Sequence, residues 1–82
     1  MIKEQVLIQK GMLSEARAKI KELESRTDVL QTTLLIKINP STEPEQLDVE
    51  AIYEAAYMLR ETVLKIQELR KKEKAISEAI GG

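Results

Sequence analysis

The first 37 residues carry apolar side chains at alternating spacings of three and four positions. In a heptad repeat, positions a and d are filled by Val6, Leu13, Ile20, Thr27 and Leu34 and by Ile2, Gln9, Ala16, Leu23 and Leu30. This spacing places the side chains on one stripe of an α-helix, and its length of almost five heptads is typical of a coiled-coil seam. The sequence therefore predicts a helix over about residues 2–37.

Turn-forming residues follow this helix. Pro40 lacks a backbone N–H and fixes φ, so the first helix must end before it. Thr42 and Glu45 have the spacing of a capping box at a helix start. We therefore expect a turn over about residues 38–43 and a second helix over about residues 43–80. Asp48 is an alternative cap that would move the start to about residue 48.

The second helix carries its own apolar stripe, which is filled by Val49, Ile52, Ala56, Leu59, Val63 and Ile66 and then by Leu69, Ile76 and Ile80. Two consecutive steps of three form a stammer, which changes the local winding of a coiled coil. Glu73 interrupts the second part of the stripe. Helices of similar length with a short connection predict an antiparallel hairpin.

Three glycines bear on the helix ends and interiors. Gly11 lies inside the first helix, where glycine costs about 1 kcal/mol relative to alanine. A close backbone contact or a frayed first turn would account for its presence. Gly81 and Gly82 follow the second helix, and glycine commonly ends a helix.

The fold class expected from these patterns is all-α, with residues 1–82 forming a single helical hairpin of the coiled-coil type. Both helices carry apolar residues outside the seam, which are Leu7, Ile8, Met12, Val29, Leu35, Ile36 and Ile38 on the first and Leu47, Tyr53, Tyr57, Met58 and Leu69 on the second. Burial of apolar side chains in one narrow seam contributes little free energy compared with the cost of ordering the chain, which is about 1.5 kcal/mol per residue. We therefore expect two hairpins to form a homodimeric four-helix bundle. The expected oligomer interface consists of Val6, Leu13, Ile20, Leu23, Leu30, Leu34, Ile52, Leu59, Val63 and Ile66.

Three polar residues interrupt the seams: Gln9, Thr27 and Glu73. Buried polar residues of this kind can fix the register and the oligomeric state of a coiled coil. The alternative is that these layers are partly hydrated and carry no such role.

The composition excludes most small-domain chemistry. The 82 residues contain neither Cys nor His, which removes disulfides, thiolate or imidazole metal ligands and the commonest nucleophiles and bases. No segment resembles a phosphate-binding loop. We therefore expect a protein that is not an enzyme and uses no cofactor or metal.

The charges and the amino-terminal sequence point to a cytoplasmic protein. Thirteen basic and 14 acidic residues give a net charge of −1, so no long-range field attracts a charged partner. The first 13 residues mix charged and apolar side chains and do not resemble a signal peptide. The apolar runs are far shorter than the roughly 20 residues that cross a bilayer, so we expect no membrane insertion.

Two local surfaces remain as candidates for partner contacts. Tyr53, Tyr57 and Met58 follow the turn and form a possible protein-binding surface, although they could equally close the end of the bundle. Arg70, Lys71, Lys72 and Lys74 form a basic run beside the expected position of Lys3 and Lys10. The turn has the opposite charge, with Glu43, Glu45, Asp48 and Glu50 opposed only by Lys37.

The leading hypothesis is a self-associating, non-enzymatic adaptor or structural subunit that docks a larger protein partner near the two tyrosines. The alternative is a small nucleic-acid-binding bundle that contacts phosphates through the basic run. Interleaved acidic residues and the lack of aromatic side chains for base stacking make this alternative the weaker one.

Overall fold

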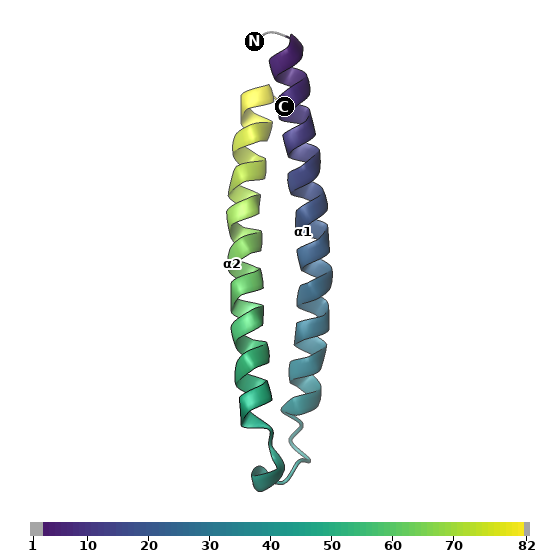
Figure 1. Cartoon of the computed structure of the whole chain (residues 1–82), viewed down its shortest axis with the longest axis vertical. Coiled ribbons are helices and arrows are strands. Elements are labelled where there is room, and N and C mark those ends of the chain that lie inside the picture. Colours follow the sequence, from purple (N-terminus) through teal and green to yellow (C-terminus); the bar gives the residue numbers. More distant parts are fainter. Residues whose placement is uncertain (1–2, 82) are drawn as a thin grey trace.

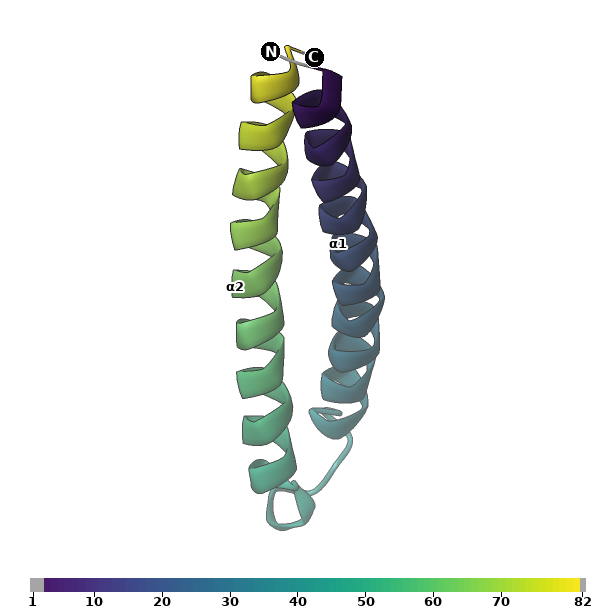
Figure 2. The ribbon, with the colours of Figure 1, turned by 45° about the horizontal axis from the view of Figure 1, so that its top comes forward.

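Two long helices packed side by side form most of the structure, a computed structural model that describes residues 3–81. Helix α1 spans Lys3–Lys37, the short 3-10 helix η1 spans Pro44–Gln46, and helix α2 spans Val49–Ile80. Figures 1 and 2 show that α1 and α2 run in opposite directions, with η1 at the closed end. The expected all-α, antiparallel hairpin is therefore confirmed.

The hairpin is a rod. Its Cα atoms extend over 63 × 16 × 14 Å, and their radius of gyration is 18.5 Å. A globular domain of this length would have a radius of gyration of about 12 Å. Each residue consequently has few neighbours across the rod, and the interior is limited to the single seam between α1 and α2.

The second helix begins later than the capping-box pattern predicts. Asp48 is its N-cap, and the side chain of Asp48 accepts a hydrogen bond of 3.1 Å from the backbone N–H of Ala51. Pro44 instead opens η1, whose N-cap makes no side-chain hydrogen bond. The expected start near residue 43 is thus wrong, and the alternative start at Asp48 is correct. The extended backbone of Leu47 separates η1 from α2, so the two helical segments cannot be continuous.

The turn is held by local hydrogen bonds around Asn39. Its side-chain oxygen accepts from the N–H of Ser41 at 2.9 Å, and its carbonyl accepts from the N–H of Thr42 at 3.0 Å. Side chains of Asn commonly stabilise turns in this way. At the other end of α2, Gly81 adopts the left-handed conformation with φ 82° and closes the helix, as expected. Gly82 lies outside the described residues.

The seam of α1 follows the predicted heptad positions. Ala16, Ile20, Leu23 and Leu30 are buried. Val6, Gln9, Leu13, Thr27 and Leu34 are half-buried. Ile2, the first expected d position, lies outside the described residues. A Cβ atom added to Gly11 would meet no atom within 4 Å, so the expected close contact is not present, and α1 continues through this residue.

The seam of α2 differs from the predicted stripe and contains no stammer. Ala55 and Thr62 are buried, whereas Val63 is 36% exposed and Val49 is 62% exposed. The inward-facing positions of α2 therefore continue in regular steps of three and four, through Ile52, Ala55, Leu59, Thr62, Ile66, Leu69, Glu73, Ile76 and Ile80. The predicted stripe contains an interruption because it includes Ala56 and Val63, whereas their neighbours Ala55 and Thr62 are the buried residues.

The polar residues in the seams have different environments. The hydroxyl of Thr27 donates to the carbonyl of Leu23 in its own helix at 2.9 Å, so it does not reach α2. The side-chain oxygen of Gln9 is buried and has no hydrogen-bond partner among residues 3–81. Glu73, whose side chain is 22% exposed, forms an ion pair across the seam with Arg17. Of the three, Glu73 makes a side-chain contact with the other helix, and this contact depends on the register between α1 and α2.

Candidate interaction surface

Exposed apolar side chains are concentrated in the half of the rod that contains the turn, residues 29–64, which we call the turn half. It carries nine of the 12 large apolar residues exposed along the described chain: Val29, Leu35, Ile36, Ile38, Val49, Tyr53, Tyr57, Val63 and Leu64. The other three, Leu7, Ile8 and Met12, lie near the start of α1. Between these two regions the outer surface is polar.

An interhelical ion pair identifies one side of the rod. A guanidinium nitrogen of Arg70 lies 3.4 Å from a carboxylate oxygen of Glu24. In a heptad repeat, side chains seven residues apart lie on the same side of a helix. Ile38 lies two heptads after Glu24, and Val63 and Val49 lie one and three heptads before Arg70. These three residues consequently share the side of the rod marked by the ion pair.

Leu35 and Tyr53 extend this surface, because residues three and four apart are neighbours on a helix. Leu35 precedes Ile38 by three residues, and Tyr53 follows Val49 by four. Their exposed fractions are 76% and 72%. We call the surface formed by Leu35, Ile38, Val49, Tyr53 and Val63 the apolar side. It combines residues of both helices near the turn, which the predicted stripes did not place together.

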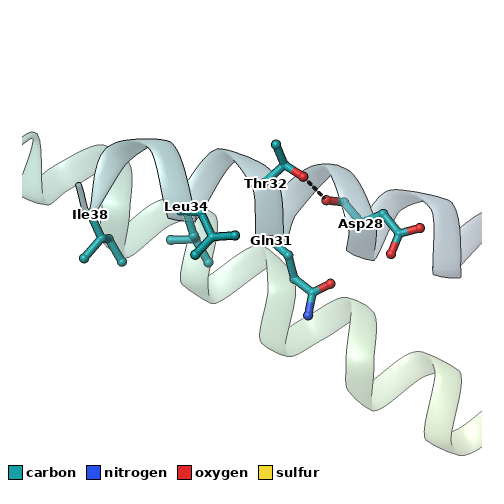
Figure 3. A pocket seen from close by; sticks show the side chains of 6 residues that line it. Asp28, Gln31, Thr32, Leu34 and Ile38 are labelled. Atoms are coloured by element: carbon teal, nitrogen blue, oxygen red, sulfur yellow. Dashed lines mark hydrogen bonds between the residues drawn. The ribbon is translucent and has the colours of Figure 1, made fainter. Parts of the chain in front are cut away.

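A shallow groove of about 670 Å³ lies along α1 on the apolar side. Its lining residues are Asp28, Gln31, Thr32, Leu34, Leu35 and Ile38. Figure 3 shows Gln31 and Leu34 extending from one side of α1 and Ile38 from just beyond its end, whereas Thr32 points away and donates to the carbonyl of Asp28. The groove is open and largely apolar, so it can accept a side chain from another molecule but does not enclose a small ligand.

A second groove, of about 630 Å³, lies further from the turn on the same side. It is lined by Arg17, Ala18, Ile20, Lys21, Glu24, Arg70 and Glu73. Glu73 contacts Arg17 at 3.6 Å and Arg70 at 3.7 Å, so its carboxylate lies between two guanidinium groups. Three basic and two acidic side chains leave an excess of positive charge here. We call this the basic groove.

Two residues of the predicted partner surface near the turn line one groove. Tyr57 and Met58 line a groove with Arg26 and Lys65, and Met58 is half-buried. Tyr53 does not line that groove and belongs to the apolar side. Tyr57 follows Tyr53 by four residues, so the two are neighbours on α2 although they line different surfaces, and whether any of the three binds a partner stays a prediction.

The predicted basic run lies at the open end of the hairpin. Lys71, Lys72 and Lys74 are exposed. Arg70 is already engaged by Glu24 and Glu73. The antiparallel arrangement brings the start of α1 to the same end, as Figure 1 shows. The acidic partners reduce the charge that this end offers to a phosphate.

Most of the expected oligomer-interface residues lie in the seam of the hairpin itself. Ile20, Leu23 and Leu30 are buried there. Leu13, Leu34, Ile52, Leu59 and Ile66 occupy half-buried seam positions, and Val6 is half-buried near the start of α1. Val63 alone lies on the apolar side. An interface between copies would therefore combine Val63 with residues outside the expected set. The spacing of Val49, Tyr53, Ala56 and Val63 is the sequence signal for this second stripe.

Residues 3–81 show no metal site and no membrane-spanning helix. His, Cys, Asp and Glu side chains in this part of the chain do not gather in a group of three that could hold a metal ion. Neither helix of the described chain has the length and apolar composition needed to span a membrane. No protein-family model, curated protein or solved structure was found to match the chain.

Proposed function

We propose that the chain is a non-enzymatic assembly module that associates with a second copy through its turn half and acts as an adaptor or structural subunit. The supporting observation is the amount of surface left in contact with water. The hairpin has an accessible surface of 6414 Å². A compact monomer of 9.3 kDa would expose about 5,000 Å².

The apolar interior of a single hairpin is small. Over the described residues the buried apolar side chains are Ala16, Ile20, Leu23, Leu30, Ala55 and Ile76. The excess exposed surface, about 1,400 Å², is larger than the roughly 800 Å² that each partner buries in a standard interface. Pairing of two hairpins would therefore bury exposed surface that a compact fold of this size buries within one chain.

Sedimentation velocity tests this proposal with a matched pair of variants. We expect the unmodified chain to sediment as a dimer. The double substitution Leu35→Ser and Tyr53→Ser should give a helical monomer, because both side chains are exposed and outside the hairpin seam. The control Leu7→Ser and Ile8→Ser removes exposed apolar side chains at the open end and should remain dimeric. A dimer that survives the first pair but not the second would contradict the assignment of the turn half.

Nucleic-acid binding is the second candidate because Lys71, Lys72 and Lys74 are exposed near one another. Titration of a labelled single-stranded RNA and a labelled DNA duplex at 50 mM and 200 mM salt distinguishes it from protein assembly. Phosphate contacts predict an affinity that falls steeply as salt rises. We expect negligible binding at both salt concentrations. Tight, salt-sensitive binding that is lost when Lys71, Lys72 and Lys74 are all replaced with glutamine would favour the second candidate.

A further inference from the structure

The charges of the rod are segregated along its length. The turn half, residues 29–64, contains six acidic and two basic residues, which gives −4. The remaining residues contain eight acidic and 11 basic residues, which gives +3. The acidic residues nearest the turn are Glu43, Glu45, Asp48 and Glu50, which we call the acidic tip; all four are exposed.

The apolar side and the basic groove follow one another along the same side of the rod. Both are defined by the Glu24–Arg70 ion pair, which lines the basic groove and marks the apolar side. Arg70 lies seven residues beyond Val63, or about 10 Å along the helix. The acidic tip lies beyond the other end of the apolar side, immediately before Val49. The order along the rod is thus acidic, apolar and basic.

This order selects one orientation for a second copy. In a parallel pair the two acidic tips would lie side by side, and like charges at short distance repel. In an antiparallel pair overlapping along its full length, the apolar side would face the charged half of the other copy. An antiparallel overlap of the turn halves alone brings Val49 of one copy near Val63 of the other. The residues preceding Val49 then lie beside those that follow Val63.

We propose that a second copy binds antiparallel, apolar side against apolar side, with the acidic tip of each copy in the basic groove of the other. The groove has three basic and two acidic side chains, so its net charge is +1, and Lys21 adds its charge to two arginines that are paired with Glu24 and Glu73. Glu45 and Asp48 are the opposing carboxylates. This inference rests on the proposed self-association and adds its orientation and its electrostatic contacts. Complementary charges of this kind fix register and exclude other arrangements.

Engineered cysteines test the orientation, because the chain contains no native cysteine. Ala56→Cys places a thiol near the centre of the overlap, so two identical copies should form a disulfide under mild copper-phenanthroline oxidation. Ser41→Cys at the tip should not link to itself. A mixture of Ser41→Cys and Gln67→Cys chains should give the 41–67 disulfide, identified by the mass of the linked tryptic peptides. All three positions are exposed, so we expect the substituted hairpins to fold.

The possible outcomes separate the orientation from the self-association. Disulfides at 56–56 and 41–67 support the proposal. A 41–41 disulfide, or a dimer in light scattering that forms neither expected disulfide, would overturn the orientation while self-association stands. A monomer in light scattering, with no disulfide above the level of a denatured control, would overturn both.

A charge reversal tests the contact of the tip with the groove independently. Glu45→Lys and Lys21→Glu should each raise the dissociation constant of the dimer about fivefold, and the double variant should return it towards the original value. Glu22→Lys changes the net charge by the same amount as Glu45→Lys and serves as the control, because Glu22 pairs with Lys19 in α1 and does not line the basic groove. Equal weakening by Glu22→Lys, or no recovery in the double variant, would contradict the contact.

Discussion

The guanidinium nitrogen Nε of Arg17 lies 3.6 Å from the carboxylate of Glu73, a residue at a seam position of α2. The side chain of Glu73 is 22% exposed and that of Arg17 is 60% exposed, so the carboxylate is the more deeply placed partner. Arg70 approaches the same carboxylate from its own helix at 3.7 Å. The seam accommodates a charge here because two guanidinium groups reach it from the surface of the rod.

Replacing Glu73 with leucine should stabilise the hairpin. The substitution loses two ion pairs with half-exposed arginines, and such pairs contribute little. It gains apolar burial in the seam. We expect Glu73→Leu to raise the free energy of unfolding by about 1 kcal/mol, measured by urea denaturation at one protein concentration. Glu68→Leu, at a side chain that is 73% exposed, is the control and should change it little. Destabilisation by Glu73→Leu would show that the ion pairs outweigh apolar burial at this position.

The start of α2 can be tested through its cap. Asp48→Ala removes the hydrogen bond to the N–H of Ala51 and should lower the free energy of unfolding by about 1 kcal/mol. Asp48→Asn keeps an accepting oxygen and should retain most of the stability. Thr42→Ala is the comparison, because Thr42 would be the cap if the helix began near residue 43. A larger loss for Thr42→Ala than for Asp48→Ala would place the helix start at the earlier position.

The two described glycines should respond in opposite directions to alanine. Gly11 lies within α1 with open space around the position of a Cβ, so Gly11→Ala should raise the free energy of unfolding by about 0.5–1 kcal/mol. Gly81 has φ 82°, where a Cβ is strained, so Gly81→Ala should lower it or fray the last turn of α2. Thermal unfolding followed by circular dichroism measures both. A loss of stability in Gly11→Ala would indicate that another molecule approaches the helix there.

Adjacent substitutions in α2 test which stripe faces the seam. Thr62 is 6% exposed, so Thr62→Asp places a charge without a partner in the seam. This variant should lose most of its helical circular dichroism signal or unfold at a much lower temperature. Val63 is 36% exposed and on the apolar side, so Val63→Asp should leave the hairpin helical while weakening association. Circular dichroism and sedimentation of the two variants provide the comparison. A larger loss of helix in Val63→Asp than in Thr62→Asp would show that the stripe predicted from apolarity alone, which contains Val63, faces the seam.

The sequence predicted α1 better than α2 for a physical reason. The apolar pattern of α1 has one dominant stripe, and the structure places it in the seam. In α2 two stripes lie one position apart, and apolarity alone favours Val63 over Thr62 as the inward residue. Thr62 can nevertheless be buried because its hydroxyl donates to the carbonyl of Met58 in the same helix at 2.7 Å. A polar side chain that is satisfied locally can occupy a seam position without a partner across it.

The candidate surface was only partly predictable. The sequence identified exposed apolar residues such as Leu35 and Tyr53, but their arrangement on one side of the rod depends on the register between the helices. The contact between Glu24 and Arg70 in the structure shows that register. The turn posed a similar problem, since both Thr42 and Asp48 are suitable caps and the choice depends on the backbone path through η1.

Light scattering across a range of protein concentrations tests the central claim, which is that one hairpin leaves too much apolar surface in water to be the final assembly. We expect a mass that approaches twice 9.3 kDa as concentration rises, with dissociation on dilution and with helical content retained near the midpoint of dissociation. A folded, thermally stable species of 9.3 kDa at every concentration up to the millimolar range would contradict it.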